Sequence, residues 1–277
     1  DKVYQPESDE LVLNIHTKNG NRKLFASVNP AASRLHLTCE NIQNPPAPFS
    51  FCMLMRKHIQ NGRITSVHQK DSERIIEIDI ETLNELGFAV SKRLIFEIMG
   101  KHSNIVLTDI STGKIIDAIK HISIDVNRVR QILPGLVYQY PPVQDKIPFK
   151  KVTENTSIPA DPKGIQRTIG GISPAFAEEL SHEDDPHRRL RNVISAVSQG
   201  SISPVVYSDE KNSPKEFYLT PLAEYEDVCQ VTRFDDMESC LEYFYSNKKS
   251  TNKLNQKASS LIRSVTSQID KLHLKEQ

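Results

Sequence analysis

Apolar and polar residues alternate in the first part of the chain, a pattern typical of β-strands with one buried face. Residues 11–15 and 24–28 carry this alternation on either side of Asn19-Gly20-Asn21. Because asparagine and glycine tolerate positive φ angles, the sequence predicts a β-hairpin with its turn at this tripeptide. A third strand is predicted over residues 35–38.

A helix and a run of short strands are predicted next. Prolines between residues 45 and 48 interrupt the alternation, and the apolar residues of 49–60 then recur at helical spacing. Gly62 is predicted to end this helix. Five strands follow, over residues 64–68, 74–80, 92–99, 104–109 and 115–119.

The five strands are short and separated by turns, which indicates a meander or a sandwich. Residues 111–113, Ser-Thr-Gly, supply one of the turns. In the strand over 74–80, isoleucines alternate with Glu77 and Asp79. Since alternate residues of a strand face opposite sides, we expect the isoleucines to be buried and the two acids to be solvated.

The second half of the chain has the pattern of helices. A proline- and lysine-rich stretch, residues 144–162, indicates a domain boundary near residue 150. Asp185-Pro186 is a suitable helix cap followed by a first-turn proline. Helices are predicted over residues 163–168, 173–181 and 186–199, a small hairpin over 204–208 and 216–220, and a last helix from 236 to the end.

Together these patterns predict an α+β protein with three parts. A β-rich domain is expected over residues 1–149, and a mostly helical domain with a small hairpin over 150–236. The start of a coiled coil is expected over 237–277, because its apolar residues recur at alternating steps of four and three. These positions are Leu254, Ala258, Leu261, Val265 and Leu272, with Gln268 as the one polar position.

The composition of the chain is that of a globular protein and does not indicate a particular binding partner. Lysine and arginine total 35, and so do aspartate and glutamate, so only local patches could argue for nucleic acid. Contents of 38% hydrophobic and 25% charged residues are ordinary for a globular protein. The mean hydropathy of -0.45 and the absence of tryptophan indicate a polar, surface-rich shape. No stretch approaches the roughly 20 apolar residues of a membrane span, so we expect no membrane partner.

Signatures of catalysis are missing from the sequence. It has no Gly-x-Ser-x-Gly, no His-Glu-x-x-His, no Walker loop and no Gly-x-Gly-x-x-Gly after a predicted strand. The four cysteines and the scattered histidines lack the spacing of a zinc site or a disulfide framework. We therefore expect a protein that is not an enzyme, holds no cofactor or metal, and keeps reduced thiols in a cytoplasm.

Residues 169–173, Ile-Gly-Gly-Ile-Ser, lie between two predicted helices and match the turn of helix-hairpin-helix modules, with Ser173 in place of the second glycine. Backbone N–H groups at such a turn can bind a phosphate, which makes Gly171 and Ser173 candidate contacts. Glu178 and Glu179, just beyond, would repel a nucleic-acid backbone. An ordinary αα-hairpin or a protein-docking surface is the other interpretation.

Two pairs of charged residues are further candidates for RNA contact. Arg56 and Lys57 lie beside the apolar stripe of the helix over 49–60, so they either face RNA or are solvated residues of a core helix. Glu73-Arg74 stands at the entry of a strand. Arg74 either forms a surface ion pair with Glu73 or presents its planar guanidinium to a phosphate or a base edge.

The strand over 92–99 ends in a glycine turn, Glu97-Ile98-Met99-Gly100-Lys101-His102. This turn places Glu97 and the cationic pair Lys101 and His102 near one rim. The rim is either an RNA-contacting edge or an ordinary loop.

Seven segments of the chain follow one another in a characteristic order. They are Tyr4-Gln5-Pro6, Arg34-Leu35-His36-Leu37-Thr38, the run from Phe51 to His58, the run from Glu73 to Ile78, the run from Glu97 to Ile105, Ile132-Leu133-Pro134-Gly135 and Tyr140-Pro141-Pro142. Through these segments the chain resembles the N-terminal domain of the NFACT family. The likeness continues through residues 169–173 to the predicted coiled coil, and the family includes bacterial fibronectin-binding proteins and a bacterial ribosome quality-control factor.

The resemblance implies a fold. The first domain is expected to be like the N-terminal lobe of formamidopyrimidine-type DNA glycosylases, and the second is expected to be a helix-hairpin-helix domain. The resemblance also implies a helical segment before Asp1 and a later domain beyond the coiled coil.

The resemblance also implies a function and a binding site. The family members of this kind bind tRNA and the large ribosomal subunit that carries a stalled nascent chain, and they recruit alanyl-tRNA so that the ribosome adds C-terminal alanines. The family ties tRNA engagement to an acidic-Arg pair, here Glu73-Arg74, and to the run Glu97-Ile98-Met99. Position 73 departs from the family, which usually has aspartate there, so the carboxylate of Glu73 stands one methylene further from the backbone.

Two alternatives come from the same resemblance. A fibronectin-binding adhesin would act at the cell surface and would bind fibronectin. A DNA-binding protein like the glycosylases would need an N-terminal proline amine as nucleophile, a nearby glutamate and a zinc finger. The chain has no zinc-ligand set and opens with Asp1.

Overall fold

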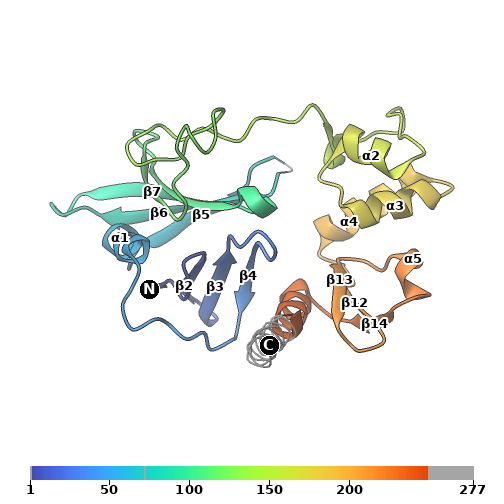
Figure 1. Cartoon of the computed structure of the whole chain (residues 1–277), viewed down its shortest axis with the longest axis horizontal. Helices are drawn as coiled ribbons and strands as arrows, with labels where there is room; N and C mark the ends of the chain where they lie inside the picture. The colour runs from blue at the N-terminus through green and yellow to red at the C-terminus, as the bar shows by residue number, and fades with distance from the viewer. Residues whose placement is uncertain (1, 72, 249–277) are drawn as a thin grey trace, which may run out of the picture. The chain divides into compact units, whose positions relative to one another are not determined.

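The computed structural model describes residues 2–71 and 73–248, and the chain forms two compact units (Figure 1). The first unit ends at Ser181 and the second begins at His182. The fold is mixed α/β, and most of its strands lie in the N-terminal region. The β-rich beginning that the alternation predicts is confirmed.

A four-stranded antiparallel sheet opens the first unit, with its strands in the order of the chain. The predicted hairpin is confirmed: Thr17 pairs with Gly20, whose φ of 107° suits glycine. The first strand is not predicted from the sequence, because three residues are too few to show alternation. The strands are β1 (Lys2–Tyr4), β2 (Glu10–Thr17), β3 (Gly20–Ser27) and β4 (Arg34–Thr38).

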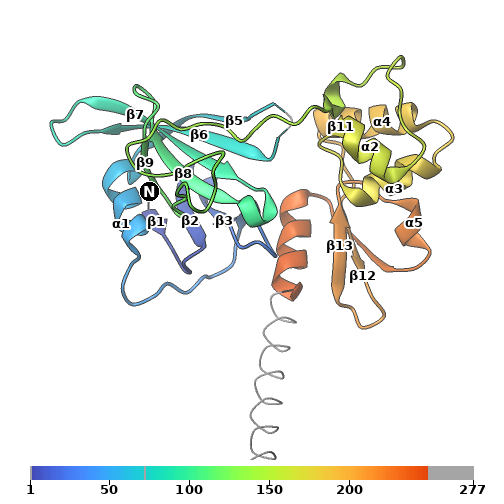
Figure 2. The ribbon, with the colours of Figure 1, turned by 45° about the horizontal axis from the view of Figure 1, so that its top comes forward.

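A five-stranded antiparallel meander forms the second sheet of this unit (Figure 2). All five strands predicted from the alternation are present, so the meander is confirmed. Gly113, in the turn before the last strand, has a φ of 67°. The strands are β5 (Arg63–Gln69), β6 (Ile75–Leu83), β7 (Ala89–Glu97), β8 (Asn104–Asp109) and β9 (Ile115–Ala118).

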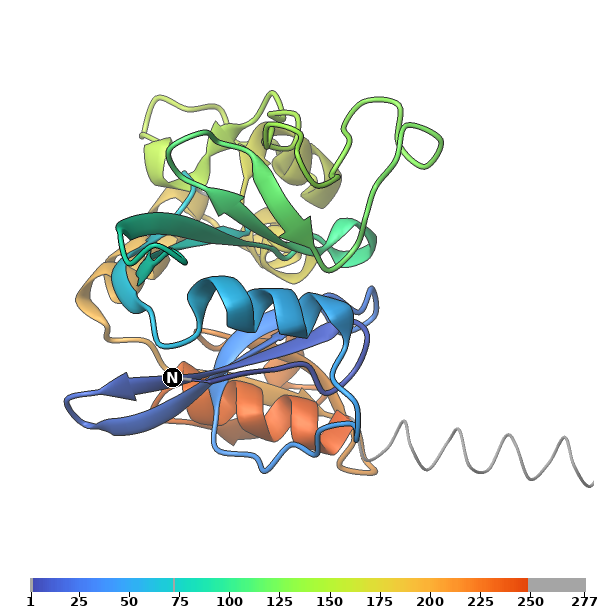
Figure 3. The ribbon, with the colours of Figure 1, turned by 90° about the vertical axis from the view of Figure 1, so that its left-hand side faces the viewer.

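The predicted helix is confirmed as α1 (Ser50–Ile59), which lies between the two sheets (Figure 3). Its buried side chains join one core with residues of both sheets, such as Leu11 of β2 and Phe96 of β7. Burying a large apolar side chain stabilises a fold by about 1.5 to 3 kcal/mol. The helix therefore holds the sheets together through apolar packing. Its core residues are Phe51, Cys52, Met55 and Ile59.

Gly62 has a different role from the predicted one. The helix ends at Ile59, and Asn61, with a φ of 61°, adopts the left-handed conformation that follows it. Gly62 lies so close to β6 that a Cβ atom there would stand 2.6 Å from Cγ2 of Ile80. Glycine is required here by close packing against the sheet.

Residues 119–140 cover the face of the five-stranded sheet opposite α1. Ile122 and Ile132 form a β-bridge within this covering segment. Ile132 packs on Ile75 and Ile95, among other residues of that face. The covering segment therefore gives the sheet a second buried face.

Short elements complete the first unit, and its predicted helices are confirmed. They are the 3-10 helices η1 (Gly100–His102) and η2 (Phe149–Lys151), the parallel pair β10 (Ile147–Pro148) and β11 (Ile169–Gly170), and the helices α2 (Pro162–Thr168) and α3 (Pro174–His182).

The second unit begins with α4 (Pro186–Gln199), as predicted. Its cap is Asp185, whose Oδ1 accepts a hydrogen bond of 2.9 Å from the N–H of Arg188. The predicted hairpin is also present. A third strand joins its sheet, and a short helix precedes that strand; the sequence does not predict either of them. These elements are β12 (Val205–Ser208), β13 (Pro214–Tyr218), α5 (Ala223–Glu226) and β14 (Gln230–Arg233).

Residues 237–248 are helical, in agreement with the start of the predicted last helix. Cys240 and Phe244 of this helix pack on Val206 of β12. The apolar positions on which the coiled-coil prediction depends lie outside the described residues.

Replacing Gly62 by alanine is expected to lower the free energy of unfolding by about 1 to 3 kcal/mol, because the added methyl group overpacks the contact with Ile80. Gly170→Ala is the matched control, since its Cβ would stand 3.5 Å from Cβ of Lys146, an ordinary contact. Urea unfolding followed by circular dichroism measures both variants. Equal stabilities would contradict this account of Gly62.

Candidate functional site

Two of the predicted RNA-contacting segments meet at one end of the five-stranded sheet. Ile75, the first residue of β6, pairs with Glu97, the last residue of β7. One step further out, the N–H of Ile98 donates a 2.8 Å hydrogen bond to the carbonyl oxygen of Arg74. Segments that are 20 or more positions apart in the chain are therefore adjacent.

The turn between β5 and β6 presents the first segment to solvent. Glu73 and Arg74 are both exposed. The backbone of Glu73 is fixed on both sides, since its N–H donates to the carbonyl of Lys70 at 2.9 Å and its carbonyl accepts from Nε2 of Gln69 at 2.7 Å. Asp71 has a φ of 49° and forms a 2.7 Å ion pair with Lys70. The described residues of this turn thus combine exposed charges with a backbone that is hydrogen-bonded at Glu73.

The second segment has a buried acid at its base. The carboxylate of Glu97 is 1% exposed and accepts hydrogen bonds from both terminal nitrogens of Arg130 and, at 2.7 Å, from the hydroxyl of Tyr138. Burial, followed by the neighbouring Glu97 charge, raises the pKa of Tyr138 well above its usual range. The side chain of Glu97 therefore does not reach the surface, and it is bound by the covering segment.

The rim continues into η1, where Lys101 and His102 are exposed. The N–H of Met99 donates to the hydroxyl of Ser103 at 2.8 Å, which closes this turn on itself. Both cations thus follow directly on the second segment, as the glycine turn predicts.

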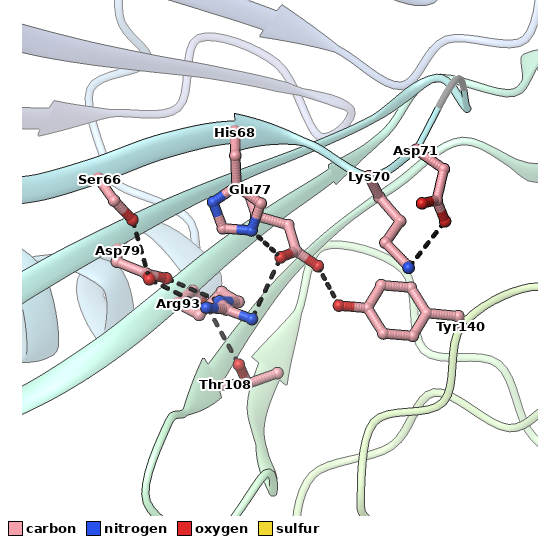
Figure 4. Close-up of polar contacts among 9 residues, drawn as sticks. All are labelled: Ser66, His68, Lys70, Asp71, Glu77, Asp79, Arg93, Thr108 and Tyr140. Carbon is pink, nitrogen blue, oxygen red and sulfur yellow. Dashed lines mark hydrogen bonds and ion pairs between the residues drawn. The ribbon is translucent and has the colours of Figure 1, made fainter. Parts of the chain in front are cut away.

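Glu77 contradicts the expectation that it faces water. Glu77 is 1% exposed, and its carboxylate is enclosed by side chains from β5, β7 and the covering segment (Figure 4). Oε2 lies 2.5 Å from Nε2 of His68 and 3.1 Å from a terminal nitrogen of Arg93, and Oε1 accepts a hydrogen bond from the hydroxyl of Tyr140. The prediction is wrong because the covering segment buries the second face of β6.

Asp79, two residues along the same strand, is half-buried. Arg93 of β7 binds it with two nitrogens, Nε at 2.7 Å and a terminal nitrogen at 2.9 Å, and Ser66 adds a third hydrogen bond at 3.0 Å (Figure 4). The hydrogen bonds from Arg93 hold the pKa of Asp79 below its usual range, against the opposing effect of burial. Arg93 thus joins both acids of β6 on one face of the sheet.

Sequence reasoning missed the residues that form this network, although a signal is present. Asp79 lies directly opposite Arg93, and Glu77 lies directly opposite His68 in the sheet. The signal is that the predicted strand with the acids Glu77 and Asp79 is flanked by predicted strands that carry basic residues, which can pair with the acids across the sheet. The missed residues of the network are His68, Glu77, Asp79, Arg93 and Tyr140, and the missed partners of Glu97 are Arg130 and Tyr138.

The other predicted contacts lie on different elements. Arg56 of α1 donates a 2.8 Å hydrogen bond from Nε to the carbonyl of Val3 and so holds β1. Lys57 forms an exposed 2.9 Å ion pair with Glu85. In the connection between α2 and α3, Gly171 has a φ of 83°, and Oγ of Ser173 accepts a 3.2 Å hydrogen bond from the N–H of Phe176. Ser173 therefore caps α3.

Across residues 2–71 and 73–248, histidine, cysteine, aspartate and glutamate side chains form no group of three or more that could hold a metal ion. Within the same residues, the helices are all too short or too polar to cross a membrane.

The family model described as NFACT N-terminal and middle domains matches residues 1–277. The chain belongs to the NFACT family. A protein of Bacillus subtilis named Rqc2 homolog RqcH is 34% identical to this NFACT chain over 280 residues, which cover 96% of the chain and 48% of the relative. A protein of the same name from Streptococcus suis is 32% identical. The chain thus spans about half the length of these relatives.

Solved structures of two other proteins have the same fold as this chain. The N-terminal part of the fibronectin/fibrinogen-binding protein from Streptococcus suis superposes with a TM-score of 0.75 at 32% identity, over 90% of this chain and 91% of that one. The fibrinogen binding protein from Staphylococcus aureus superposes with a TM-score of 0.73 at 28% identity, over 88% and 90% of the two chains.

Replacing Glu77 by alanine is expected to destabilise the first unit by about 1 to 3 kcal/mol, because Arg93 and Tyr140 lose a buried acceptor. Glu81→Ala, on the same strand and the same face, is the matched control. Its partner Arg63 is 76% exposed, so the expected change is within about 0.5 kcal/mol. Urea unfolding compares the two variants, and a control loss as large as that of Glu77→Ala would contradict the role of burial.

Burial and the hydrogen bond to Glu77 raise the pKa of Tyr140 from 10.0 to about 12. The folded state therefore favours the neutral phenol, whose stabilising contribution is complete below pH 10 and is lost as the pH rises toward 12. We expect the difference in phenolate absorbance between the wild type and Tyr140→Phe to titrate near pH 12, and Glu77→Gln to move that midpoint toward 10. A wild-type midpoint at 10 would contradict the assignment.

Proposed function

We propose that this chain is the tRNA-binding part of a ribosome quality-control factor that acts on the large ribosomal subunit beside a stalled nascent chain. The observation that supports this function best is the hydrogen bond between Arg74 and Ile98, which brings Glu73-Arg74 beside Ile98-Met99. The family ties both segments to tRNA. The similarity to proteins named Rqc2 homolog RqcH agrees with this proposal.

The exposed charges of Arg74, Lys101 and His102 at this end of the sheet are suited to binding RNA. Arg74 is exposed, and its planar guanidinium can bind a phosphate or a base edge with two parallel hydrogen bonds. Lys101 and His102 extend the cationic surface along the same end of the sheet. Sequence-specific RNA recognition targets unpaired bases in loops, which an exposed strand end can approach.

The proposed role requires no catalysis by this chain. It recruits alanyl-tRNA in the cytoplasm, without a cofactor, and the ribosome performs the peptidyl transfer that adds alanines to the nascent chain. The buried carboxylates of Glu77 and Glu97 support this view, since each is occupied by an arginine and a tyrosine. Glu73→Asp, which restores the residue usual in the family, tests which tRNA the turn selects.

We also infer that the first unit uses a glycosylase-like lobe and a helix-hairpin-helix turn for docking on nucleic acid, without base excision. The left-handed Gly171 and the cap formed by Ser173 agree with such a turn. Each contact that this turn makes with a phosphate would add to the salt dependence of binding.

Fibronectin binding at the cell surface is the second candidate function. Its support is that the solved structure from Streptococcus suis belongs to a fibronectin/fibrinogen-binding protein. Surface labelling of intact cells, compared with a cytosolic marker, distinguishes it from the ribosomal function.

Replacing Glu73 and Arg74 together by alanine is expected to abolish copurification of tRNA and to leave the fold intact, because both side chains are exposed. Arg63→Gln, an exposed arginine whose partner Glu81 lies at the far end of β6, is the charge control and is expected to retain tRNA. Sequencing of bound RNA measures both variants. If the wild type enriches no tRNA over background, the proposed function is wrong.

A further inference from the structure

Tyr140 differs from the other aromatic residue of the covering segment in its exposure. Tyr138 is half-buried, whereas Tyr140 is 40% exposed although its hydroxyl is bound to buried Glu77. The two rings meet edge to face, with centroids 5.2 Å apart and an angle of 81° between their planes. Tyr140 is therefore a partly exposed ring whose orientation is fixed from two sides.

The ring lies beside the turn that carries Glu73 and Arg74. Nζ of Lys70, in that turn, stands 5.4 Å from the centroid of the Tyr140 ring. Figure 4 shows the two side chains next to each other. A cation at this distance is attracted to an aromatic face. The exposed ring and the exposed turn thus lie next to each other in the first unit.

Two further lysines follow in η2 of the first unit, and one of them lies near this turn. Lys150 and Lys151 of η2 are exposed. The hydrogen bond from Lys70 holds the pKa of Asp71 below its usual value, and the nearby charge of Lys151 adds to this effect. Lys151 therefore lies close to the turn, although it is 80 positions later in the chain.

We propose that Tyr140 stacks on an unpaired base of the bound RNA while Lys150 and Lys151 contact its phosphates. This inference rests on the proposed function and adds a residue type that the rim lacks, an aromatic platform. Proteins that bind unpaired nucleotides combine a cationic track with aromatic side chains, because every base offers a face for stacking. A ring that is already fixed loses little conformational freedom when the base arrives.

The matched variants are Tyr140→Phe, which keeps the ring, and Tyr140→Leu, which removes it. Binding of fluorescein-labelled unfractionated tRNA is measured by fluorescence anisotropy from about 50 to 200 mM NaCl. Tyr140→Leu is expected to weaken binding at least about fivefold at every salt concentration, while Tyr140→Phe binds like the wild type. The slope of log affinity against log salt should stay unchanged in both variants.

The lysines are tested by the salt slope. Lys150→Gln with Lys151→Gln is expected to reduce the slope by about 0.7 for each phosphate that a lysine no longer neutralises. Lys114→Gln is the control. Lys114 is exposed and lies between β8 and β9, at the end of the sheet opposite to Glu97. A slope like that of the wild type in the double variant would contradict the phosphate contacts.

The outcomes separate the two proposals. If the wild type binds tRNA and Arg74→Ala weakens it, but Tyr140→Leu binds like Tyr140→Phe, the stacking role is wrong and the proposed function stands. If the wild type binds no tRNA, both are wrong. Should Tyr140→Leu fail to fold, ultraviolet crosslinking of the wild type to tRNA decides: a crosslinked peptide with Tyr140 supports stacking, and its absence from the crosslinked peptides overturns it.

Discussion

The burial of two carboxylates on the outer face of the five-stranded sheet is the constraint on which the rest of the site depends. Glu77 and Glu97 are each 1% exposed. Removing an ionised carboxylate from water costs on the order of several kcal/mol unless charged and hydrogen-bonding partners replace the water. For Glu97 these partners are Arg130 and Tyr138, and for Glu77 they include Tyr140, all from the covering segment. The segment from 119 to 140 must therefore return across the sheet.

This return has a consequence for the surface above it. The same hydrogen bonds that satisfy the two acids fix the ends of β6 and β7, where Arg74 and Ile98 are joined through their backbones. A binding surface at the ends of paired strands is more rigid than one on a long loop, so less order has to be gained when a ligand binds. The buried acids Glu77 and Glu97 therefore belong to the same two strands whose ends carry the exposed Arg74 and lead to Lys101.

The balanced net charge of the chain conceals how its charges are used. Arg93 and Arg130 are committed to internal carboxylates and contribute little to the field outside the protein. Other cations, among them Arg74, Lys101 and Lys151, are exposed in the first unit. An electrostatic interface for RNA can therefore exist on a chain in which lysine and arginine only equal aspartate and glutamate.

Much of the secondary structure could be predicted from the sequence alone. The hairpin over β2 and β3, the meander, α1 and the capped α4 all depend on local periods, turn residues and caps, which a short window of sequence contains. The sequence also identifies the pair Glu73-Arg74 and the run Glu97-Ile98-Met99 as two separate candidate RNA-contacting segments. The tertiary structure alone decided that these segments are neighbours, that Gly62 is required by Ile80, and that Glu77 is buried. Each of these depends on residues distant in the chain, and the alternation of one strand cannot reveal whether its polar face meets water or another part of the protein.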